Sequence, residues 1–595
     1  MTKLKKLITL FALTLVFTSC AGTAADNDAK KIFEDEKEAF EKRIAFQTPL
    51  KDEIKFGVVE TVENLNPFYN KDESSKIITS MLYQNLFTIE DTHHQEEFNY
   101  LLADSLTSSE DGTVYNLKLK DNLYWHNGDR ITVDDIIFSI KYSYENKDTV
   151  YLNNFLVDGK EITMNKVSDT ELEFILPKPS FTFKYSLESL KVVPAKTFKD
   201  APKQFTFEDK NHLIGSGPYV FDEKVHDDYF NVDEFKFKAF DKYFEGPANI
   251  PKLSIKNVAH YSSTRYDMLD YNIQGGYILG NDVGAFVKDF YNINTVEAGN
   301  VKSLLFKVNN PVVKDEGMRN AICNLVNSYN LSSIFGDNTN VSRANSVFGH
   351  NNFYKYNDNL VDEMASGNAI EYIKKYQREH EDSTLKMGFI LDPGEPQEKF
   401  AVSIQESFIN RGIDIELVAL YEEEYLEELK DPNSKVFDFC LYEYDSNDNP
   451  DYFKNFFKTD GALNYSGYSN TELDPLWQEA QIEKDFQKRL ETYGDIQSII
   501  NEDKPVYPLF FANKIVATDD RIINIEEAVA NGSSFFTHLN KLDIKEFEAS
   551  KEDIKKYKID ESSIKRKPKY DDVNIFTKNS QPKKVVKPEG AKEIK

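Results

Sequence analysis

The sequence is poor in cysteine and histidine, with 3 Cys and 9 His among 595 residues. One cysteine, Cys20, stands near the start of the chain, so only Cys323 and Cys440 remain in the body. These two have neither the Cys-x-x-Cys spacing nor the neighbouring histidines of a structural metal site, so we predict no metal and no cofactor. They are equally compatible with one disulfide and with two buried thiols.

Common catalytic motifs are also missing. The sequence has no Gly-x-Ser-x-Gly, no His-Glu-x-x-His and no phosphate-binding loop. Ser383-Thr-Leu-Lys386 has the spacing Ser-x-x-Lys, but the Ser-Asp-Asn and Lys-Thr-Gly motifs that accompany it in enzymes are absent. His93-His94 beside Glu96 reads as an exposed polar turn rather than a metal site. We therefore expect a binding protein and not an enzyme.

Positive charge is in short supply, and the net charge is −28. A body of this sign repels phosphate backbones, so we expect no nucleic-acid partner. Apolar residues make up 40% and aromatics 13% of the chain, which is enough for large cores. The length predicts two to four domains.

Long apolar runs are absent after the first twenty residues, and no later segment reaches the 18 residues of a spanning helix. The N-terminus itself has a basic start, a short apolar run from Leu7 to Phe17, and small residues before Cys20, which is typical of a secretory signal. Residues 1–19 are therefore predicted to be a signal peptide. Cys20 resembles the acylated cysteine of a bacterial lipobox, although Phe17 replaces the usual Leu. An ordinary signal peptide with an incidental cysteine is the alternative.

The two ends of the remaining chain differ from its body. Residues 20–51 are rich in Ala, Lys and Glu, and we predict a lipidated, solvated tether with one short helix. Residues 551–595 are basic and have few apolar residues, so we predict a disordered tail. Such a tail suits either an anionic surface or a plain solubilising extension.

The body mixes predicted strands and helices. Residues 114–119 and 170–176 alternate apolar and polar side chains, as half-buried strands do. Thr132 is placed to cap an amphipathic helix that follows it. Thr471 is placed to cap one long helix that runs to about residue 500. Neighbouring elements of both kinds indicate layered α/β structure.

Several landmarks occur in an order that resembles one known family. Residues 123–139 read Leu-Tyr-Trp-His-Asn-Gly-Asp-Arg-Ile-Thr-Val-Asp-Asp-Ile-Ile-Phe-Ser, close to that family's signature. Gly215-Ser-Gly-Pro-Tyr219, Asp241–Pro247 and Asp315–Ala321 follow in the family order. The chain thus resembles the bacterial extracellular solute-binding proteins of family 5, the oligopeptide- and dipeptide-binding type, over about residues 52–545. Lys307 departs from the pattern, which often has Asn there.

The resemblance implies a periplasmic-binding-protein-like (type II) α/β fold. Two lobes form a clamshell, and an extra subdomain is inserted into the first lobe. By this analogy, lobe 1 holds residues 52–90, 185–300 and 505–550. The inserted subdomain holds residues 91–184, and lobe 2 holds residues 301–504. The ligand is expected between the lobes, as is common for small-molecule sites.

The resemblance also implies ligand-binding residues in the segment 437–450. The family places an Asp there for the α-ammonium group of a peptide. Counting from the strand gives Asp445, whereas counting back from Pro450 gives Asp448, because this loop is one residue longer. Tyr442 matches a cleft tryptophan that packs on the ligand. Glu443 matches a position whose backbone pairs with the ligand.

Three further residues are predicted to approach the ligand. Tyr69 and Asn70 fall where the first lobe of the family contributes backbone contacts. Tyr507 lies near the second crossing between the lobes. Without the resemblance, the acidic loop would be read as a solvated turn, since Asp, Asn and Pro are turn formers.

The function implied is that of a substrate-binding lipoprotein of an ABC transporter. It would capture oligopeptides or dipeptides as a monomer and deliver them to a permease and ATPase complex. Its expected place is the cell envelope, lipid-anchored to the membrane on the periplasmic or extracellular face. The alternatives are the same receptor fold with nickel, haem or an oligosaccharide as ligand, or a surface sensor or adhesin.

Overall fold

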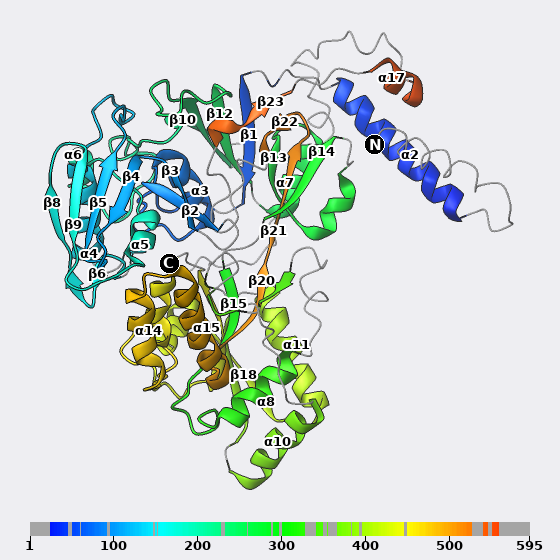
Figure 1. Ribbon diagram of the computed structural model, residues 1–595. Helices are drawn as coiled ribbons and strands as arrows, with labels where there is room; N and C mark the ends of the chain where they lie inside the picture. Colours follow the sequence, from blue (N-terminus) through cyan, green and yellow to red (C-terminus); the bar gives the residue numbers. More distant parts are fainter. Residues whose placement is uncertain are drawn as a thin grey trace, which may run out of the picture. The chain divides into compact units, whose positions relative to one another are not determined.

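The chain divides into two compact units, residues 51–545 and residues 1–50 with 546–595. The computed structural model (Figure 1) describes residues 24–45, 50, 52–59, 61–91, 96–146, 149–151, 153–227, 232–258, 260–286, 290–296, 300–327, 341–344, 346–348, 354, 366–381, 383–391, 396–445, 449–525, 539–545 and 550–558. The predicted signal peptide and Cys20 lie outside these residues. The two units are described separately below.

The larger unit contains a first, seven-stranded sheet. Its strand order is β10-β11-β12-β1-β13-β21-β14, and β1 runs parallel to both β12 and β13. The strands are β1 (Glu53–Val58), β10 (Tyr219–Asp227), β11 (Val232–Ala239), β12 (Lys252–Asn257), β13 (Gly275–Ile278), β14 (Tyr291–Val296) and β21 (Lys514–Asp519). Helices α3 (Glu73–Leu82) and α7 (Tyr261–Leu269) belong to the same part of the chain.

A second sheet has six strands in the order β16-β20-β15-β19-β17-β18. They are β15 (Asn300–Phe306), β16 (Val341–Arg343), β17 (Leu385–Ile390), β18 (Ile415–Leu420), β19 (Phe439–Asp445) and β20 (Val506–Ala512). Alternate residues of β15 enter different cores, since Leu304 and Phe306 join one apolar cluster while Val301 and Leu305 join another. This alternation shows that both faces of the sheet are buried.

Each face of the second sheet is covered by its own helices. The cluster around Leu304 contains residues of α8 (Glu316–Asn327), α10 (Ser366–Glu379) and α11 (Pro396–Asn410). The cluster around Val301 contains residues of α12 (Glu422–Lys430), α13 (Lys454–Phe457), α14 (Leu473–Ile482) and α15 (Phe486–Asp503). The mixed α/β class predicted from the sequence is confirmed.

A smaller, four-stranded sheet is formed within residues 103–175, in the order β4-β5-β9-β8. Its strands are β4 (Ala103–Ser108), β5 (Val114–Leu119), β8 (Thr163–Lys166) and β9 (Glu171–Ile175). The two strands predicted from alternation are confirmed, and they pair with each other antiparallel, Val114 opposite Ile175. The hairpin of β2 (Phe87–Asp91) and β3 (Glu96–Tyr100) and helix α5 (Phe183–Ser189) flank this sheet in sequence.

The predicted helix after Thr132 is confirmed as α4 (Val133–Glu145). Thr132 and Asp135 form a capping box, in which the Thr132 N–H donates to the Asp135 carboxylate at 3.0 Å. The long helix predicted from Thr471 is wrong, because the chain forms two helices, α14 and α15. Asp485 caps the second helix by accepting from the Lys488 N–H, which ends the continuous helical path at residues 483–485.

Two of the sequence landmarks meet in space. The backbone N–H of His126 donates to the Gly215 carbonyl at 2.8 Å, and the Gly215 N–H donates to His126 Nδ1 at 3.1 Å. A Cβ on Gly215 would lie 1.8 Å from the Leu82 carbonyl oxygen, and one on Gly217 would lie 1.9 Å from that of Met81. The glycines therefore permit close backbone contact with the end of α3.

The smaller unit is built on α2 (Ala24–Ala45) and α17 (Lys551–Tyr557), which contact each other. The Tyr557 ring lies 5.8 Å from that of Phe33 and 4.9 Å from that of Phe40, measured between centroids. The Tyr557 hydroxyl also donates to Glu36 at 3.1 Å. The start of the predicted tail thus forms a short helix, whereas residues 559–595 lie outside the described part of the chain.

Cys323 and Cys440 are both buried and free. Burial raises the pKa of the Cys440 thiol to about 11, so this sulfur is unreactive at neutral pH. Among the residues that the structure describes, none of the helices has the length and apolar character needed to cross a bilayer.

Candidate functional site

The chain passes between the two large sheets twice. β14 ends in the first sheet at Val296 and β15 begins in the second at Asn300. β20 ends in the second sheet at Ala512, and β21 begins in the first at Lys514. Because β15 pairs with β20 and Val301 lies opposite Phe511, both crossings leave the second sheet at the same end.

The C-terminal end of β19 lies beside these crossings. β19 pairs antiparallel with β15, and its last residue, Asp445, stands opposite Asn300, the first residue of β15. Asp445 is therefore at the edge of the second sheet that faces the strand connections to the first. Its side chain is not among the described groups, and Asp448 lies outside the described residues.

Tyr442 is part of an aromatic group on one face of the second sheet. Its ring centroid lies 5.7 Å from Tyr444, 6.4 Å from Tyr465 and 6.5 Å from Phe456. Burial raises the pKa of its hydroxyl well above the ordinary value, and the neighbouring tyrosines add to this effect. Its backbone carbonyl accepts from the Ser303 hydroxyl at 2.8 Å. Tyr442 is half-buried.

Glu443 points to the opposite face of β19 from Tyr442, since successive side chains of a strand alternate. It is exposed, and its carboxylate accepts from Asn300 Nδ2 at 2.7 Å and forms an ion pair with Lys302. The Glu443 carboxylate is thus bound by two side chains of the adjacent strand β15.

Tyr69 and Asn70 lie in the turn before α3. The Asn70 side chain is buried, and its Nδ2 donates to Thr79 Oγ1 at 2.7 Å, so it holds the turn against α3. Tyr69 is half-buried, with its ring 6.4 Å from that of Tyr142 and the Lys203 ammonium 5.4 Å from its centroid. The Asn70 side chain thus contacts α3, and the Tyr69 ring contacts α4.

Tyr507 lies in β20, where it stands opposite Leu304 of β15. It is 1% exposed and belongs to the apolar cluster beneath α8, α10 and α11, on the other face of the sheet from Tyr442. Its hydroxyl accepts from Arg343 Nη2 at 3.1 Å. The structure therefore groups Tyr442, Glu443 and Asp445 on one strand, with Tyr507 packed beneath a separate helical layer.

A cavity of about 440 Å³ is lined in part by residues that follow β19 in the sequence, beginning at Asn449. Three separate segments line it, residues 153–159, 178–186 and 449–482. Among its lining residues, the indole Nε1 of Trp477 is buried and makes no hydrogen bond to the described part of the chain. Sequence reasoning missed this cavity because no motif connects segments about 300 positions apart.

Asp451 illustrates how these segments are joined. Its carboxylate accepts from the Thr182 hydroxyl, from the Tyr493 hydroxyl at 3.0 Å, and from the Lys454 ammonium at 2.8 Å. Asp451 thereby connects Thr182, the residue before α5, with Tyr493 of α15. Within the described residues, no group of three His, Cys, Asp or Glu side chains has the geometry of a metal site.

Comparison with known proteins gives a consistent result. The family model of the bacterial extracellular solute-binding proteins, family 5, matches residues 97–464. The oligopeptide-binding protein AppA of Bacillus subtilis is 23% identical over 559 residues, covering 88% of this chain and 95% of AppA.

Two solved structures show the same fold. The ABC transporter substrate binding protein CtaP of Listeria monocytogenes is 25% identical, with a TM-score of 0.70 over 83% of this chain and 99% of CtaP. The oligopeptide-binding protein AppA of Bacillus subtilis, in complex with a nonapeptide, is 20% identical, with a TM-score of 0.64 over 83% of this chain and 99% of AppA. The predicted type II periplasmic-binding-protein fold is thus confirmed.

Proposed function

Because the chain belongs to the bacterial extracellular solute-binding proteins of family 5, we propose that it captures peptides between its two large sheets for an ABC importer. The named relatives reported above are binding proteins, and AppA of Bacillus subtilis carries a nonapeptide in its solved structure. A permease and an ATPase would be the partners that accept the loaded protein.

The observation that carries this proposal is the position of the β19 end. Asp445 pairs with Asn300 at the edge where both crossings leave the second sheet. Two bodies joined by a pair of crossings can hinge about them, and a ligand held in the seam is then enclosed by both. Beyond Cys440, the edge of β19 away from β15 pairs with no described strand, and it would supply backbone donors and acceptors to an extended ligand, as an added strand requires.

Asp445 is our candidate for the group that binds the α-ammonium of the peptide, and Asp448 is the alternative. A carboxylate gives a charge-assisted hydrogen bond to an ammonium that contributes roughly 1.5–3 kcal/mol. Tyr442, half-buried beside this strand end, would pack on the ligand. The backbone of Glu443 would pair with it, because its carboxylate is already bound by Asn300 and Lys302. We also propose that Tyr69 and Asn70 contribute backbone contacts to the ligand, and that Tyr507 approaches it near the second crossing.

Calorimetric titration with a tripeptide and with its N-acetylated form tests both the ligand class and the site. The free peptide should bind, and acetylation should weaken binding because it removes the ammonium charge. Asp445→Asn should weaken the free peptide about tenfold or more and leave the acetylated one nearly unchanged. Glu416→Gln, an equal charge change at an exposed position of β18 in the same sheet, is the matched control.

Each outcome of this titration has a defined meaning. Unchanged affinity in Asp445→Asn with a tenfold loss in Asp448→Asn assigns the ammonium to Asp448. Equal binding of both peptides by all variants removes the ammonium role altogether. Binding of nickel, haem or an oligosaccharide in place of every peptide would replace the ligand class and keep the receptor fold.

We further propose that Cys20 is acylated after removal of residues 1–19, which would anchor the protein on the outer side of a membrane. Helix α2 begins four positions after Cys20 and has 22 residues, so the lipid would be attached close to the N-terminal end of this helix. Metabolic labelling with a fatty acid should mark the wild type. The Cys20→Ala variant should lose the label and leave the membrane fraction, and retention of both would contradict the anchor.

A further inference from the structure

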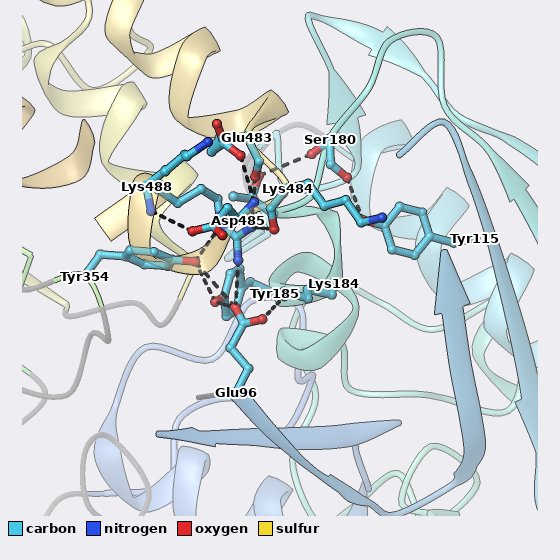
Figure 2. A network of polar contacts seen from close by, with 12 residues as sticks. Glu96, Tyr115, Ser180, Lys184, Tyr185, Tyr354, Glu483, Lys484, Asp485 and Lys488 are labelled. Carbon is cyan, nitrogen blue, oxygen red and sulfur yellow. Dashed lines mark hydrogen bonds and ion pairs between the residues drawn. The ribbon is translucent and has the colours of Figure 1, made fainter. Parts of the chain in front are cut away.

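A buried ionic network joins the segment inserted between β1 and β10 to helix α15 (Figure 2). The Glu96 carboxylate, at the start of β3, forms ion pairs with Lys184 of α5 and with Arg489 of α15, the latter at 3.2 Å. Tyr185 donates its hydroxyl to the same carboxylate. Arg489 Nε donates to the Tyr354 hydroxyl at 2.9 Å, and this hydroxyl lies 3.0 Å from that of Tyr185.

The charged groups of the network have little contact with solvent. The Arg489 side chain is 1% exposed, and those of Glu96 and Lys184 are 13% exposed. Burial alone would raise the pKa of Glu96, but the two cations more than offset it, and the pKa lies below its ordinary value. The carboxylate is therefore ionised at neutral pH, and its attraction to Arg489 acts in a poorly hydrated environment.

Further polar contacts cross this interface beside the rings of Tyr185 and Tyr354, whose centroids lie 6.0 Å apart. Asn449 donates to the Ser186 hydroxyl at 3.1 Å, and the Phe181 N–H donates to the Gln481 carbonyl at 2.8 Å. The 440 Å³ cavity described above lies within the same interface. The polar groups around the cavity are hydrated when the interface opens, which offsets part of the cost of separating the two sides.

The path of the chain allows this separation. Between α5 and the second sheet, the chain runs through β10, β11, β12, β13 and β14 of the first sheet. The inserted segment and α15 thus have no direct covalent connection, and none of the strand pairs of the sheets joins them. The two can part while every sheet stays intact.

We propose that the contact between Glu96 and Arg489 is a reversible latch, which forms when the inserted segment closes against α15 and breaks when the ligand enters or leaves. This inference rests on the proposed function, since a latch of this kind regulates access to the ligand seam. By stabilising the closed form, it raises the apparent affinity for any ligand that binds that form better.

A cross-linking reporter measures the latch without any ligand. Glu110 and Lys484 form an ion pair of 2.7 Å between the same two segments, and both side chains are more than half exposed. The substitutions Glu110→Cys and Lys484→Cys place two thiols within reach of a short bis-maleimide, whereas Cys323 and Cys440 are buried. The rate of cross-linking then reports the closed fraction of the population.

Glu96→Gln in this reporter background should slow cross-linking about threefold or more, and in the otherwise unchanged chain it should weaken peptide binding by a similar factor. Tyr354→Phe, which removes one hydroxyl and keeps the ion pair, should act in the same direction but more weakly. Glu110→Gln makes the same charge change in an ion pair of the same interface whose carboxylate is 95% exposed, so peptide affinity should stay within twofold.

The outcomes separate the latch from the proposed function. An unchanged cross-linking rate in folded Glu96→Gln, verified by circular dichroism, overturns the latch even where peptide affinity falls. A slower rate in a protein that binds no peptide supports the latch and overturns the peptide assignment. If Glu96→Gln does not fold, Tyr354→Phe gives the decision, and an unchanged rate there likewise overturns the latch.

Discussion

Lys307 stands where the family pattern often has Asn, and its side chain connects three buried segments of the chain. The residue is fully buried, and its ammonium donates to the carbonyl oxygens of Leu429 at 2.7 Å, Asp431 at 2.8 Å and Tyr465 at 3.0 Å. Burial lowers the pKa of Lys307 to about 8. One side chain thus connects β15 with the end of α12 and the loop before α14, so the departure from the family pattern is structural.

Lys307→Met should lower the free energy of unfolding by about 3 kcal/mol, because three buried carbonyl groups lose their donor at once. Urea denaturation followed by circular dichroism measures this change. Lys386→Met on β17, an exposed lysine of the same sheet, is the control and should change stability by less than about 0.5 kcal/mol. Equal effects of the two variants would contradict the role of Lys307.

Gly217→Ala should destabilise the protein by about 3 kcal/mol or more, because the new Cβ would lie 1.9 Å from the Met81 carbonyl oxygen and one backbone has to move. A Cβ at Gly284 meets nothing within 4 Å, so Gly284→Ala is the matched control. A thermal scan of both variants decides, and a Gly217→Ala protein as stable as the wild type would refute the close contact.

The sequence alone does not show why glycine is required at positions 215 and 217. Their neighbours are Leu82 and Met81, more than 130 positions earlier, so the reason for glycine is visible only in the fold. Trp125, in contrast, has an apolar side chain that favours burial, and it is 2% exposed. Burial of an apolar side chain can be predicted from the residue type alone. A close contact between two backbones can be predicted only when the distant partner is known.

At the scale of elements, the junction between residues 125–128 and 215–219 joins the inserted segment to the first sheet. His126 accepts from the Gly215 N–H through Nδ1, and its Nε2 lies 3.0 Å from the Gly217 carbonyl oxygen. The hydrogen bonds require a neutral ring with the proton on Nε2. Burial lowers the pKa of His126 to about 4.

This junction predicts a loss of stability in mild acid. Because the folded pKa is below the ordinary value of 6.5, the unfolded chain binds the extra proton first. The stability that His126 contributes is complete above about pH 6.5 and decreases as the pH falls toward 4. Between pH 7.5 and pH 5, the wild type should lose about 2 kcal/mol more than His126→Gln, measured by urea denaturation. Parallel pH profiles of the two proteins would contradict this account.

Helix boundaries show the limit of periodicity as a predictor. Residues 471–500 carry apolar side chains at helical spacing throughout, yet the chain turns at residues 483–485. Arg489 donates to the carbonyls of Glu483 and Lys484 at 2.8 Å each, in the linker between α14 and α15. The break is thus stabilised by a side chain of the next helix, which a one-dimensional pattern does not contain. The start of α4 after Thr132, which depends on local sequence, was predicted correctly.

At the scale of the whole larger unit, function depends on two sheets that share two crossings. The resemblance to a known family predicted the fold, and the comparison with CtaP confirms it. The same resemblance predicted ligand-binding residues in the segment 437–450. In the structure, the strand of this segment ends at Asp445, beside both crossings. The cavity and the network around Glu96 were not predicted, because each is assembled from segments hundreds of positions apart and neither has a motif.

Ligand binding should therefore stabilise the entire unit. A ligand that binds only the folded protein adds about 2.7 kcal/mol to the free energy of unfolding at 100 times its dissociation constant. A thermal-shift series with peptides of two to nine residues should show an increase in melting temperature that grows with peptide concentration. Concentration-independent melting with every peptide would contradict peptide capture.

The most direct measurement of the central claim is a crystal structure of the protein with a bound tripeptide. We predict density for the peptide in the seam between the two large sheets, along the end of β19, with its α-ammonium within about 3 Å of the Asp445 or the Asp448 carboxylate. A peptide bound away from the crossings, or one whose ammonium contacts neither carboxylate, would contradict the claim.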